Sequence, residues 1–380
     1  MITLTGKYNT AIVFANKIDG KSEESIIQYL DHPMFADTKV RIMPDVHAGV
    51  GSTIGFTATC NDYVAPAIIG VDIGCGVNAY NIGEGSVTFN KLDSYIRKHI
   101  PSGRCVNESA NTLLEKAYEY VQSETPFHEF IKTVNKLSQK VRIPESRAIA
   151  SLGTLGGGNH FIEVDTDETG NRWVLIHSGS RGFGSYVSNY HQKLANKRTV
   201  KESPIKVLTG VAAEEYIEDM ITAQLYARVN RALIAYQICC EFLKVAHSKL
   251  FAIESVHNYI DFGSNVIRKG AISAKSGESV IIPFSMADGA VVGEGKGNSE
   301  WNCSAPHGSG RKLSRTQAKD LSLDEYRRRM SGVWSSCVGQ TTVDESPMAY
   351  KPLEDVMAFI GETIDIKHYL KPIYNFKATE

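Results

Sequence analysis

Four strand-like apolar segments of this 380-residue chain each contain a side chain able to bind a metal ion. The segments cover residues 66–80, 152–164, 173–184 and 253–261, and glycines lie close to the polar side chain in the first three. Polar residues of functional interest run from position 45 to position 377, so they have to converge in one fold. No linker, low-complexity tract or internal repeat divides the chain. We therefore expect residues 1–380 to form a single domain.

Strand patterns and long helical patterns are mixed along the chain. Apolar residues recur at helical spacing in 113–121, 127–141 and 211–251, whereas 11–14 and 280–286 resemble strands. This mixture predicts a mixed α/β fold of the α+β type, with central β-sheets flanked by helices.

Two local predictions concern segments beside residues of interest. The apolar flanks within 66–80 are expected to be buried strands. The last helix is expected to begin at Pro352 and to end before Pro372, leaving a short tail that carries Tyr374 and Lys377.

Charge and cysteine content narrow the classes of partner and compartment. The net charge of -1 provides no overall basic field, so a nucleic-acid partner would have to be held by a local patch. The seven cysteines form no repeating framework and the N-terminus lacks signal-peptide features, which indicates a cytoplasmic protein. No apolar run approaches the roughly 18 residues of a membrane span.

The Gly-rich stretch Ala305–Arg311 places His307 among small residues and beside an arginine. Such a histidine could attack a phosphoryl group, with the guanidinium of Arg311 binding phosphate. A surface turn explains the same stretch equally simply.

Mixed oxygen, sulfur and nitrogen ligands point to a divalent metal site. Asp72 and Cys75 lie in the first apolar segment, and the other three segments supply His160, His177 and His257. One thiolate among carboxylate and imidazole ligands favours a catalytic site, with sulfur bridging two ions. The alternative is structural: an Asx turn at Asp72, a small buried thiol at Cys75, and core histidines.

Two further loops are candidate site edges. Asp45 and His47 precede a glycine in what is expected to be a turn after a strand, where the alternative is a turn-capping carboxylate and a core histidine. The loop after His177 carries Arg181 among glycines and serines, a composition that suits oxyanions or a plain strand-to-helix connection.

Several blocks occur in an order that resembles a known family. They are MPDVHAG, GVDIGCG, GTLGGGNHFIE, HSGSRGFG, SVHNY, IPFSM, HGSGR, AYKPLEDVM and the near-terminal Lys377. Over essentially its whole length the chain resembles the RtcB family of GTP-dependent RNA ligases. The resemblance implies an RtcB-like catalytic domain.

The resemblance also implies a site with two Mn²⁺ ions and GTP. Asp72, Cys75 and His160 would hold one ion, while Cys75, His177 and His257 would hold the second. His307 would be the nucleophile that takes GMP from GTP, and Asp45 would orient its imidazole. The implied guanylate contacts are Asn159, Phe161, Glu163, Asn258, Ser285, Ser309, Gly310, Tyr350 and Lys377.

By the same resemblance, the substrates are RNA ends. A 2′,3′-cyclic phosphate would be opened to a 3′-phosphate, activated with GMP, and joined to a 5′-hydroxyl, in tRNA splicing or RNA repair. Arg181 and Arg311 are candidate contacts for RNA phosphate, and an activating protein is a candidate partner. The alternatives are a dinuclear metal-dependent phosphoesterase and a non-catalytic RNA-binding protein.

Three departures from the family pattern concern the phosphate side of the pocket. Residues 287–290 bring an acid and lack the usual serine, Glu294 stands where arginine is frequent, and Pro306 precedes His307 where Ser or Cys is common. We expect any difference from the relatives to appear there.

Overall fold

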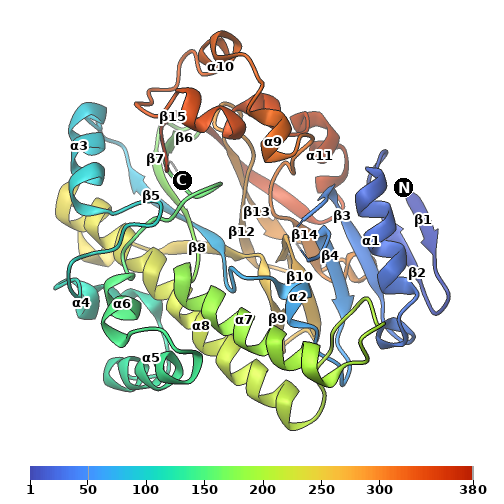
Figure 1. Ribbon diagram of the computed structural model, residues 1–380. Helices are drawn as coiled ribbons and strands as arrows, with labels where there is room; N and C mark the ends of the chain where they lie inside the picture. The colour runs from blue at the N-terminus through green and yellow to red at the C-terminus, as the bar shows by residue number, and fades with distance from the viewer. Residues whose placement is uncertain (50, 379–380) are drawn as a thin grey trace.

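The computed structural model describes residues 1–49 and 51–378, and two large β-sheets form its centre (Figure 1). The first sheet has six strands in the order β1-β2-β3-β4-β10-β9. Neighbouring strands are antiparallel except for the parallel pair β2 and β3. Its strands are β1 (Ile2–Thr5), β2 (Thr10–Val13), β3 (Val40–His47), β4 (Ile54–Thr59), β9 (Asn258–Asp261) and β10 (Val266–Lys269).

The second sheet has seven strands in the order β12-β13-β15-β6-β7-β5-β8, and all of its neighbouring pairs are antiparallel. A two-stranded ribbon of β11 and β14 completes the β structure. These strands are β5 (Gly76–Gly83), β6 (Phe161–Thr166), β7 (Arg172–Ser178), β8 (Ala252–Val256), β11 (Ala271–Ser273), β12 (Ser279–Pro283), β13 (Ala290–Gly295), β14 (Ser304–Pro306) and β15 (Ile364–Lys377).

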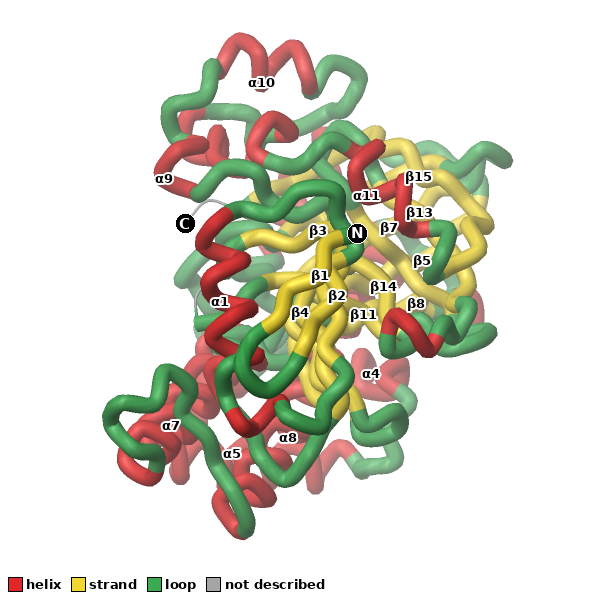
Figure 2. The backbone as a smooth tube through the Cα atoms, turned by 90° about the vertical axis from the view of Figure 1, so that its right-hand side faces the viewer, coloured by secondary structure: helices red, strands yellow, loops and turns green. Residues whose placement is uncertain are grey.

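Helices lie on opposite sides of the strands. In both views α5, α7 and α8 gather below the strands, while α9 and α10 lie above them (Figures 1 and 2). Within the described residues, none of the helices has the length and apolar character needed to cross a bilayer. The α-helices are α1 (Gly20–Leu30), α2 (Pro66–Ile69), α3 (Phe89–His99), α4 (Leu114–Tyr118), α5 (Phe127–Val141), α6 (Glu145–Ala150), α7 (Arg181–Arg198), α8 (Val211–Ala235), α9 (Arg315–Ala318), α10 (Leu323–Arg329) and α11 (Leu353–Ile360). The 3-10 helices are η1 (Pro33–Phe35), η2 (Glu119–Val121), η4 (His247–Lys249), η5 (Ser299–Trp301), η6 (Gln340–Glu345) and η7 (Pro347–Ala349), and η3 (Tyr236–Phe242) is a π-helix.

The two faces of the seven-stranded sheet differ in polarity because side chains alternate along each strand. On one face Ile162, Val164, Val174 and Ile176 pack in a buried cluster with residues of α8 and η3. The opposite face carries Phe161, Glu163 and Asp165 of β6, all of them buried. The apolar face anchors the sheet, and the mixed face is available for chemistry.

Most predicted elements are confirmed, and the mixed α/β class with large antiparallel sheets is as expected. The prediction of strands on both sides of Asp72 was wrong on the N-terminal side, because Pro66–Ile69 form α2 with a proline in its first turn. Asp45 and His47 lie within β3 rather than in a turn after it. The single domain and the cytoplasmic location stay predictions.

The predicted C-terminus was also wrong. The last helix ends at Ile360, and residues 364–377 form β15 instead of continuing the helix into a short tail. The strand accommodates Pro372 at a register shift against β6, where a missing N–H costs little. As a result Tyr374 and Lys377 lie inside the sheet.

Arg231, a fully buried residue of helix α8, fixes the loops at the ends of three strands. The guanidinium of Arg231 donates to Gly74 O (2.8 Å), Ser178 O (2.9 Å) and Asn78 Oδ1 (2.7 Å). It also pairs with Glu254 Oε2 of β8 at 3.1 Å. These acceptors adjoin Cys75, His177 and the end of β8, so one side chain sets the relative positions of three strand ends.

We expect Arg231→Met to lower the free energy of unfolding by about 3–5 kcal/mol, because buried acceptors and a carboxylate lose their donor. Arg228→Met is the matched control, since Arg228 contacts the same Glu254 at 2.9 Å but its side chain is 41% exposed. That change should cost about 1 kcal/mol or less. Urea denaturation measures both, and equal losses would contradict the role given to Arg231.

Candidate functional site

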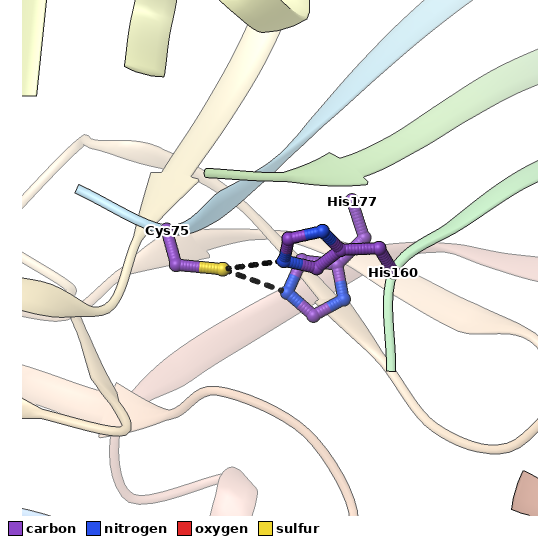
Figure 3. A group of neighbouring side chains, drawn as sticks. All are labelled: Cys75, His160 and His177. Carbon is purple, nitrogen blue, oxygen red and sulfur yellow. Dashed lines mark hydrogen bonds between the residues drawn. The ribbon is translucent and has the colours of Figure 1, made fainter. Parts of the chain in front are cut away.

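Cys75, His160 and His177 form a buried group whose ligand atoms all lie within 4.8 Å of one another. The sulfur of Cys75 is 3.5 Å from His160 Nε2 and 3.3 Å from His177 Nε2, and Figure 3 shows it directed at both rings. Asp72 Oδ2 lies 3.1 Å from His160 Nε2. The ring of His257 is 5.2 Å from that of His177, centroid to centroid. The five residues expected to bind metal therefore lie together.

Strand register brings these residues to one edge of the sheet. On β5, Gly76 lies opposite Ser178 of β7 and Val256 of β8, so Cys75 is beside His177 and His257. The backbone N–H of His257 donates to Cys75 O at 2.9 Å. On the other side of β7, Phe161 lies opposite His177, and His160 immediately precedes β6.

The outer nitrogens of two imidazoles are held by backbone carbonyls. His160 Nδ1 donates to Leu155 O at 2.8 Å, and His177 Nδ1 donates to Asn159 O at 3.2 Å. This fixes the tautomer that leaves both Nε2 lone pairs directed at Cys75, as metal-binding histidines require. The donor set fits one or two divalent cations of the manganese or zinc type.

Burial governs protonation in this group. It lowers the pKa of His177 and of His257 well below their ordinary value, which keeps both imidazoles neutral. Burial and the Asp72 charge raise the pKa of the Cys75 thiol. A bound cation would reverse the preference of the thiol, because a coordinating sulfur is deprotonated. Burial also lowers the pKa of Lys269, a buried cation near Asp72 and Cys75, to about 8.

Asp45 and His307 form a second buried pair next to the metal group. Asp45 Oδ2 accepts from the Nδ1 of His307 at 2.6 Å and from its backbone N–H at 3.0 Å. The carboxylate is fully buried, whereas the imidazole is 15% exposed. The His307 ring lies 4.8 Å from that of His257. This arrangement leaves His307 Nε2 as the free, reachable nitrogen.

Lys351, which the sequence analysis missed, clamps both sides of this pair. Its Nζ donates to Pro44 O at 3.0 Å and to Val46 O at 2.5 Å, the carbonyls on either side of Asp45. Its backbone N–H donates to Gly310 O at 3.0 Å. The sequence shows Lys351 within the block AYKPLEDVM, but its structural role becomes apparent only from these long-range contacts.

A small cavity on the mixed face of the sheet adjoins the site. Five of the expected guanylate contacts line it: Phe161, Glu163, Ser285, Tyr350 and Lys377. Its other lining residues are Pro283, Phe284, Met286, Gly289 and Asn375. The ammonium of Lys377 lies 5.3 Å from the centre of the Phe161 ring. The cavity thus combines an aromatic surface, a cation and a carboxyl group.

Glu345, also missed from sequence, organises one side of this cavity. Its buried carboxylate pairs with Lys377 Nζ at 3.2 Å and with Arg311 and Arg315 at 2.9 Å each, and it accepts from Tyr350 O–H at 2.5 Å. Burial by itself would raise the pKa of Glu345, but the three cations outweigh burial and hold it at about 2. Glu345 therefore stays ionised and keeps Lys377 in place.

The remaining expected guanylate contacts lie outside the lining of the cavity. Asn159 has an exposed side chain, and its carbonyl accepts from Lys377 Nζ at 3.2 Å. Asn258 donates to Asp72 O at 3.1 Å and accepts from Gly270 N–H at 3.2 Å. Ser309 has a buried hydroxyl without a partner in the described chain, and Gly310 (φ +71°) packs directly against the Asp45 carbonyl.

The two candidate RNA-phosphate arginines already have acceptors. Arg181 is the first residue of α7, and its Nε and Nη2 donate to Thr154 Oγ1 (3.1 Å) and Gly103 O (2.7 Å). Arg311 donates from Nε to Leu313 O, from Nη1 to Glu345 and from Nη2 to Asp344 O. Both arginine side chains therefore stabilise loops of the site through these hydrogen bonds.

The three departures noted in the sequence occupy different environments. Asp288 Oδ2 accepts a short hydrogen bond from Ser285 Oγ at the cavity wall. Pro306 is the buried last residue of β14 and directly precedes His307. Glu294 on β13 lies 3.7 Å from Lys367 on β15, and both side chains are about half exposed. Only the first two adjoin the site.

Comparison with known proteins gives a consistent relationship. The family described as tRNA-splicing ligase RtcB matches residues 28–378. The chain is 32% identical over 383 residues to a protein named RNA-splicing ligase RtcB from Escherichia coli strain K12, with 94% of both chains covered. It is 27% identical over 400 residues to a protein named tRNA-splicing ligase RtcB from Nanoarchaeum equitans, with 84% of both covered.

Loss of a residue that hydrogen-bonds to a metal ligand typically weakens metal binding by roughly 10–100-fold. Cys75→Ala removes a ligand itself, so we expect it to weaken Mn²⁺ binding by more than this. Titration followed by metal analysis of the purified protein measures this. Cys239→Ala is the matched control, because Cys239 is equally buried but packs in the apolar cluster behind the sheet. Equal metal binding by the two variants would contradict a site at Cys75.

We expect Lys351→Met to lower the free energy of unfolding by about 1–3 kcal/mol, since two carbonyls beside Asp45 lose their donor. Urea denaturation measures the change. The neighbouring exposed Lys312 gives the control Lys312→Met, which should change stability by about 0.5 kcal/mol or less. A Lys351 variant as stable as this control would argue against the clamp.

Proposed function

The chain belongs to the RtcB family, and from this membership we propose that it is an RNA ligase. It joins an RNA end bearing a 2′,3′-cyclic phosphate or a 3′-phosphate to an end bearing a 5′-hydroxyl, in tRNA splicing or RNA repair. GTP supplies the energy through a covalent GMP–His307 intermediate. The observation that carries the proposal is the Asp45–His307 pair beside the metal-type group.

The Asp45–His307 geometry supports a nitrogen nucleophile. A buried carboxylate that accepts from Nδ1 keeps the proton on that nitrogen, so the Nε2 lone pair is free to attack. The same carboxylate oxygen accepts the backbone N–H of His307, which limits rotation of the ring. Partial exposure of the imidazole leaves a path for a phosphoryl group.

The metal-type residues fit two divalent cations that share Cys75, and we propose manganese. Asp72, Cys75 and His160 would hold one ion, and Cys75, His177 and His257 the other. Bound cations supply positive charge that stabilises attacking and leaving phosphate oxygens. The protein's own contribution is to hold the imidazoles neutral and oriented through Leu155 O and Asn159 O.

The reaction begins when His307 Nε2 attacks the α-phosphorus of GTP. An N–P bond forms, the bond to the β-phosphate oxygen breaks, and pyrophosphate leaves with the electron pair. Addition of water opens a cyclic phosphate to a 3′-phosphate with a free 2′-hydroxyl. An oxygen of that 3′-phosphate attacks the GMP phosphorus, and the N–P bond breaks. The 5′-hydroxyl then attacks the RNA phosphorus, GMP leaves, and the hydroxyl proton is released.

The cavity supports guanine as the base. Lys377 donates a hydrogen bond to Asn159 O and forms an ion pair with Glu345, and its ammonium group has a further N–H for the guanine O6 acceptor. Glu163 can accept from the guanine N1–H and amino groups, while Phe161 and Tyr350 offer aromatic surface. Adenine has the opposite polarity at these positions, so we propose that GTP is preferred over ATP.

Arg181 and Arg311 are the proposed contacts for RNA phosphate. Arg181 Nη1 is directed at Gly156 in the glycine-rich loop before His160, which is where an RNA end would approach the metal group. Arg311 has a single-residue β-bridge to Tyr350 and links the His307 loop to Glu345. Their existing bonds mean that phosphate would have to share their donors.

We expect α-labelled GTP with Mn²⁺ to give an acid-labile, hydroxylamine-sensitive protein adduct, and RNA carrying 2′,3′-cyclic phosphate and 5′-hydroxyl ends to be joined with GTP but not with ATP. His307→Ala should abolish both products, while Asp45→Asn should slow adduct formation by about 10²–10⁴-fold. His128→Ala is the control because His128 is exposed on α5. A phosphoesterase with the same metal residues would open the cyclic phosphate, form no adduct and join nothing.

A further inference from the structure

Asp165 on β6 carries a fully buried carboxyl group that receives no hydrogen bond from any group of the described residues. Both of its oxygens lack a hydrogen-bond donor in the described chain. Its neighbours across the sheet explain this: Trp173 on β7 donates its indole N–H to Asp167 at 2.9 Å, and Pro372 on β15 has no N–H. A bare carboxylate here would cost several kcal/mol.

The polar group that interacts with the Asp165 carboxyl group on this face is Glu163. Residues two apart on a strand project from the same face, so the two carboxyl groups are adjacent. Glu163 is also buried, and its Oε2 accepts from Asn375 Nδ2 of β15 at 2.5 Å. Glu163 lines the cavity together with Lys377, whereas Asp165 lies behind it.

Two adjacent buried carboxyl groups cannot both be ionised at moderate cost, so they retain a proton between them. Burial raises the pKa of Glu163 to about 7, against the opposing effect of Asn375 and Lys377. Burial and the nearby Glu163 raise the pKa of Asp165 well above its ordinary value. Because Asn375 and Lys377 favour charge on Glu163, the retained proton belongs to Asp165.

We propose that Asp165 is a positioning residue that stays protonated, donates its carboxyl O–H to Glu163, and holds Glu163 as the acceptor for the N–H edge of a guanine base. This inference rests on the proposed use of GTP. Asp165 does not line the cavity, but by positioning Glu163 it would influence the affinity for the nucleotide and the choice of base. A carboxylate fixed from two sides by Asn375 and Asp165 has less freedom to turn toward other partners.

The proposal makes nucleotide binding depend on pH in a defined direction. Guanine N–H groups need an ionised Glu163, so below pH of about 7 binding must first displace a proton from Glu163. Affinity should therefore fall up to about tenfold per pH unit below that point and level off above it. Burial raises the pKa of Glu163, whereas the hydrogen bond with Asp165 lowers it, so removing the donor at position 165 should raise the pKa of Glu163 further.

The other polar and charged groups near Glu163 and Asp165 are bonded elsewhere, so none of them donates a hydrogen bond to the Asp165 carboxyl group. From β15, Lys377 is held by Glu345, which stays ionised. From the turn after β12, Asp288 accepts from Ser285. Tyr350 O–H donates to Glu345. Strand β7 contributes Leu175 and Trp173 opposite the pair, which are not titratable.

The test is binding of GMP and AMP, measured by calorimetry with Mn²⁺ at pH 6, 7 and 8. Asp165→Asn and Asp165→Ser both keep a neutral donor for Glu163, so each should bind GMP within about threefold of the wild type at pH 8. Both should also keep the wild-type fall in affinity between pH 7 and pH 6, because Glu163 still titrates and still receives a hydrogen bond from a neutral group. Asp165→Val has no donor, so it should bind GMP about tenfold more weakly and discriminate less against AMP.

Comparing variants at each pH removes the contribution of the GMP phosphate, which titrates equally in all of them. Glu168→Gln is the control, since Glu168 is exposed just beyond the same strand and should keep the wild-type pH profile. The proposal is overturned if Asn, Ser and Val at position 165 behave alike, or if the Val variant keeps the affinity and pH profile of the wild type. A wild type that binds no GMP would overturn the proposed function itself.

Discussion

The register of β6, β7, β5 and β8 is the constraint on which the candidate site depends. Cys75, His177 and His257 meet because Gly76 pairs with Ser178 on one side and with Val256 on the other. A slip of one residue in any of these pairings would turn the ligand away from the others, since alternate side chains face opposite sides of a sheet. The apolar face of the sheet fixes the register because only this register buries its side chains. Arg231 of α8 also holds the strand ends together by donating to Gly74 O and Ser178 O.

A second constraint joins the six-stranded sheet to this edge. Asp45 on β3 and His307 after β14 are 262 positions apart, yet one carboxylate oxygen accepts two hydrogen bonds from the histidine. Lys351 secures the backbone on both sides of Asp45 and the loop after His307. The Asp45–His307 pair is therefore positioned by contacts among three segments that are far apart in the sequence.

The sequence predicted the chemistry of the site better than its supporting contacts. Ligand-type side chains at the ends of apolar strands were identifiable because residue type and strand pattern are local properties. Lys351 was missed because the carbonyls that it binds are 307 and 305 positions away in the chain. Glu345 was missed because its cations come from separate segments, Arg311, Arg315 and Lys377. Asp165 was missed because strand alternation places it on one face with Glu163 but does not reveal that both carboxyl groups are buried. The error at β15 has a similar origin, since Pro372 normally ends regular structure, and only the register shift beside β6 allows it within a strand.

One backbone carbonyl connects the two halves of the site. Asn159 O accepts from His177 Nδ1 and from Lys377 Nζ, both at 3.2 Å, so a metal-type ligand and the cavity cation share an acceptor. Displacement of this carbonyl would weaken both contacts at once, whereas the exposed Asn159 side chain takes no part in either. Glu345 pairs with the same ammonium group at 3.2 Å, so both a carboxylate and a carbonyl hold Lys377. The position of the ammonium group is thereby set by the fold rather than by the ligand, as a selective site requires.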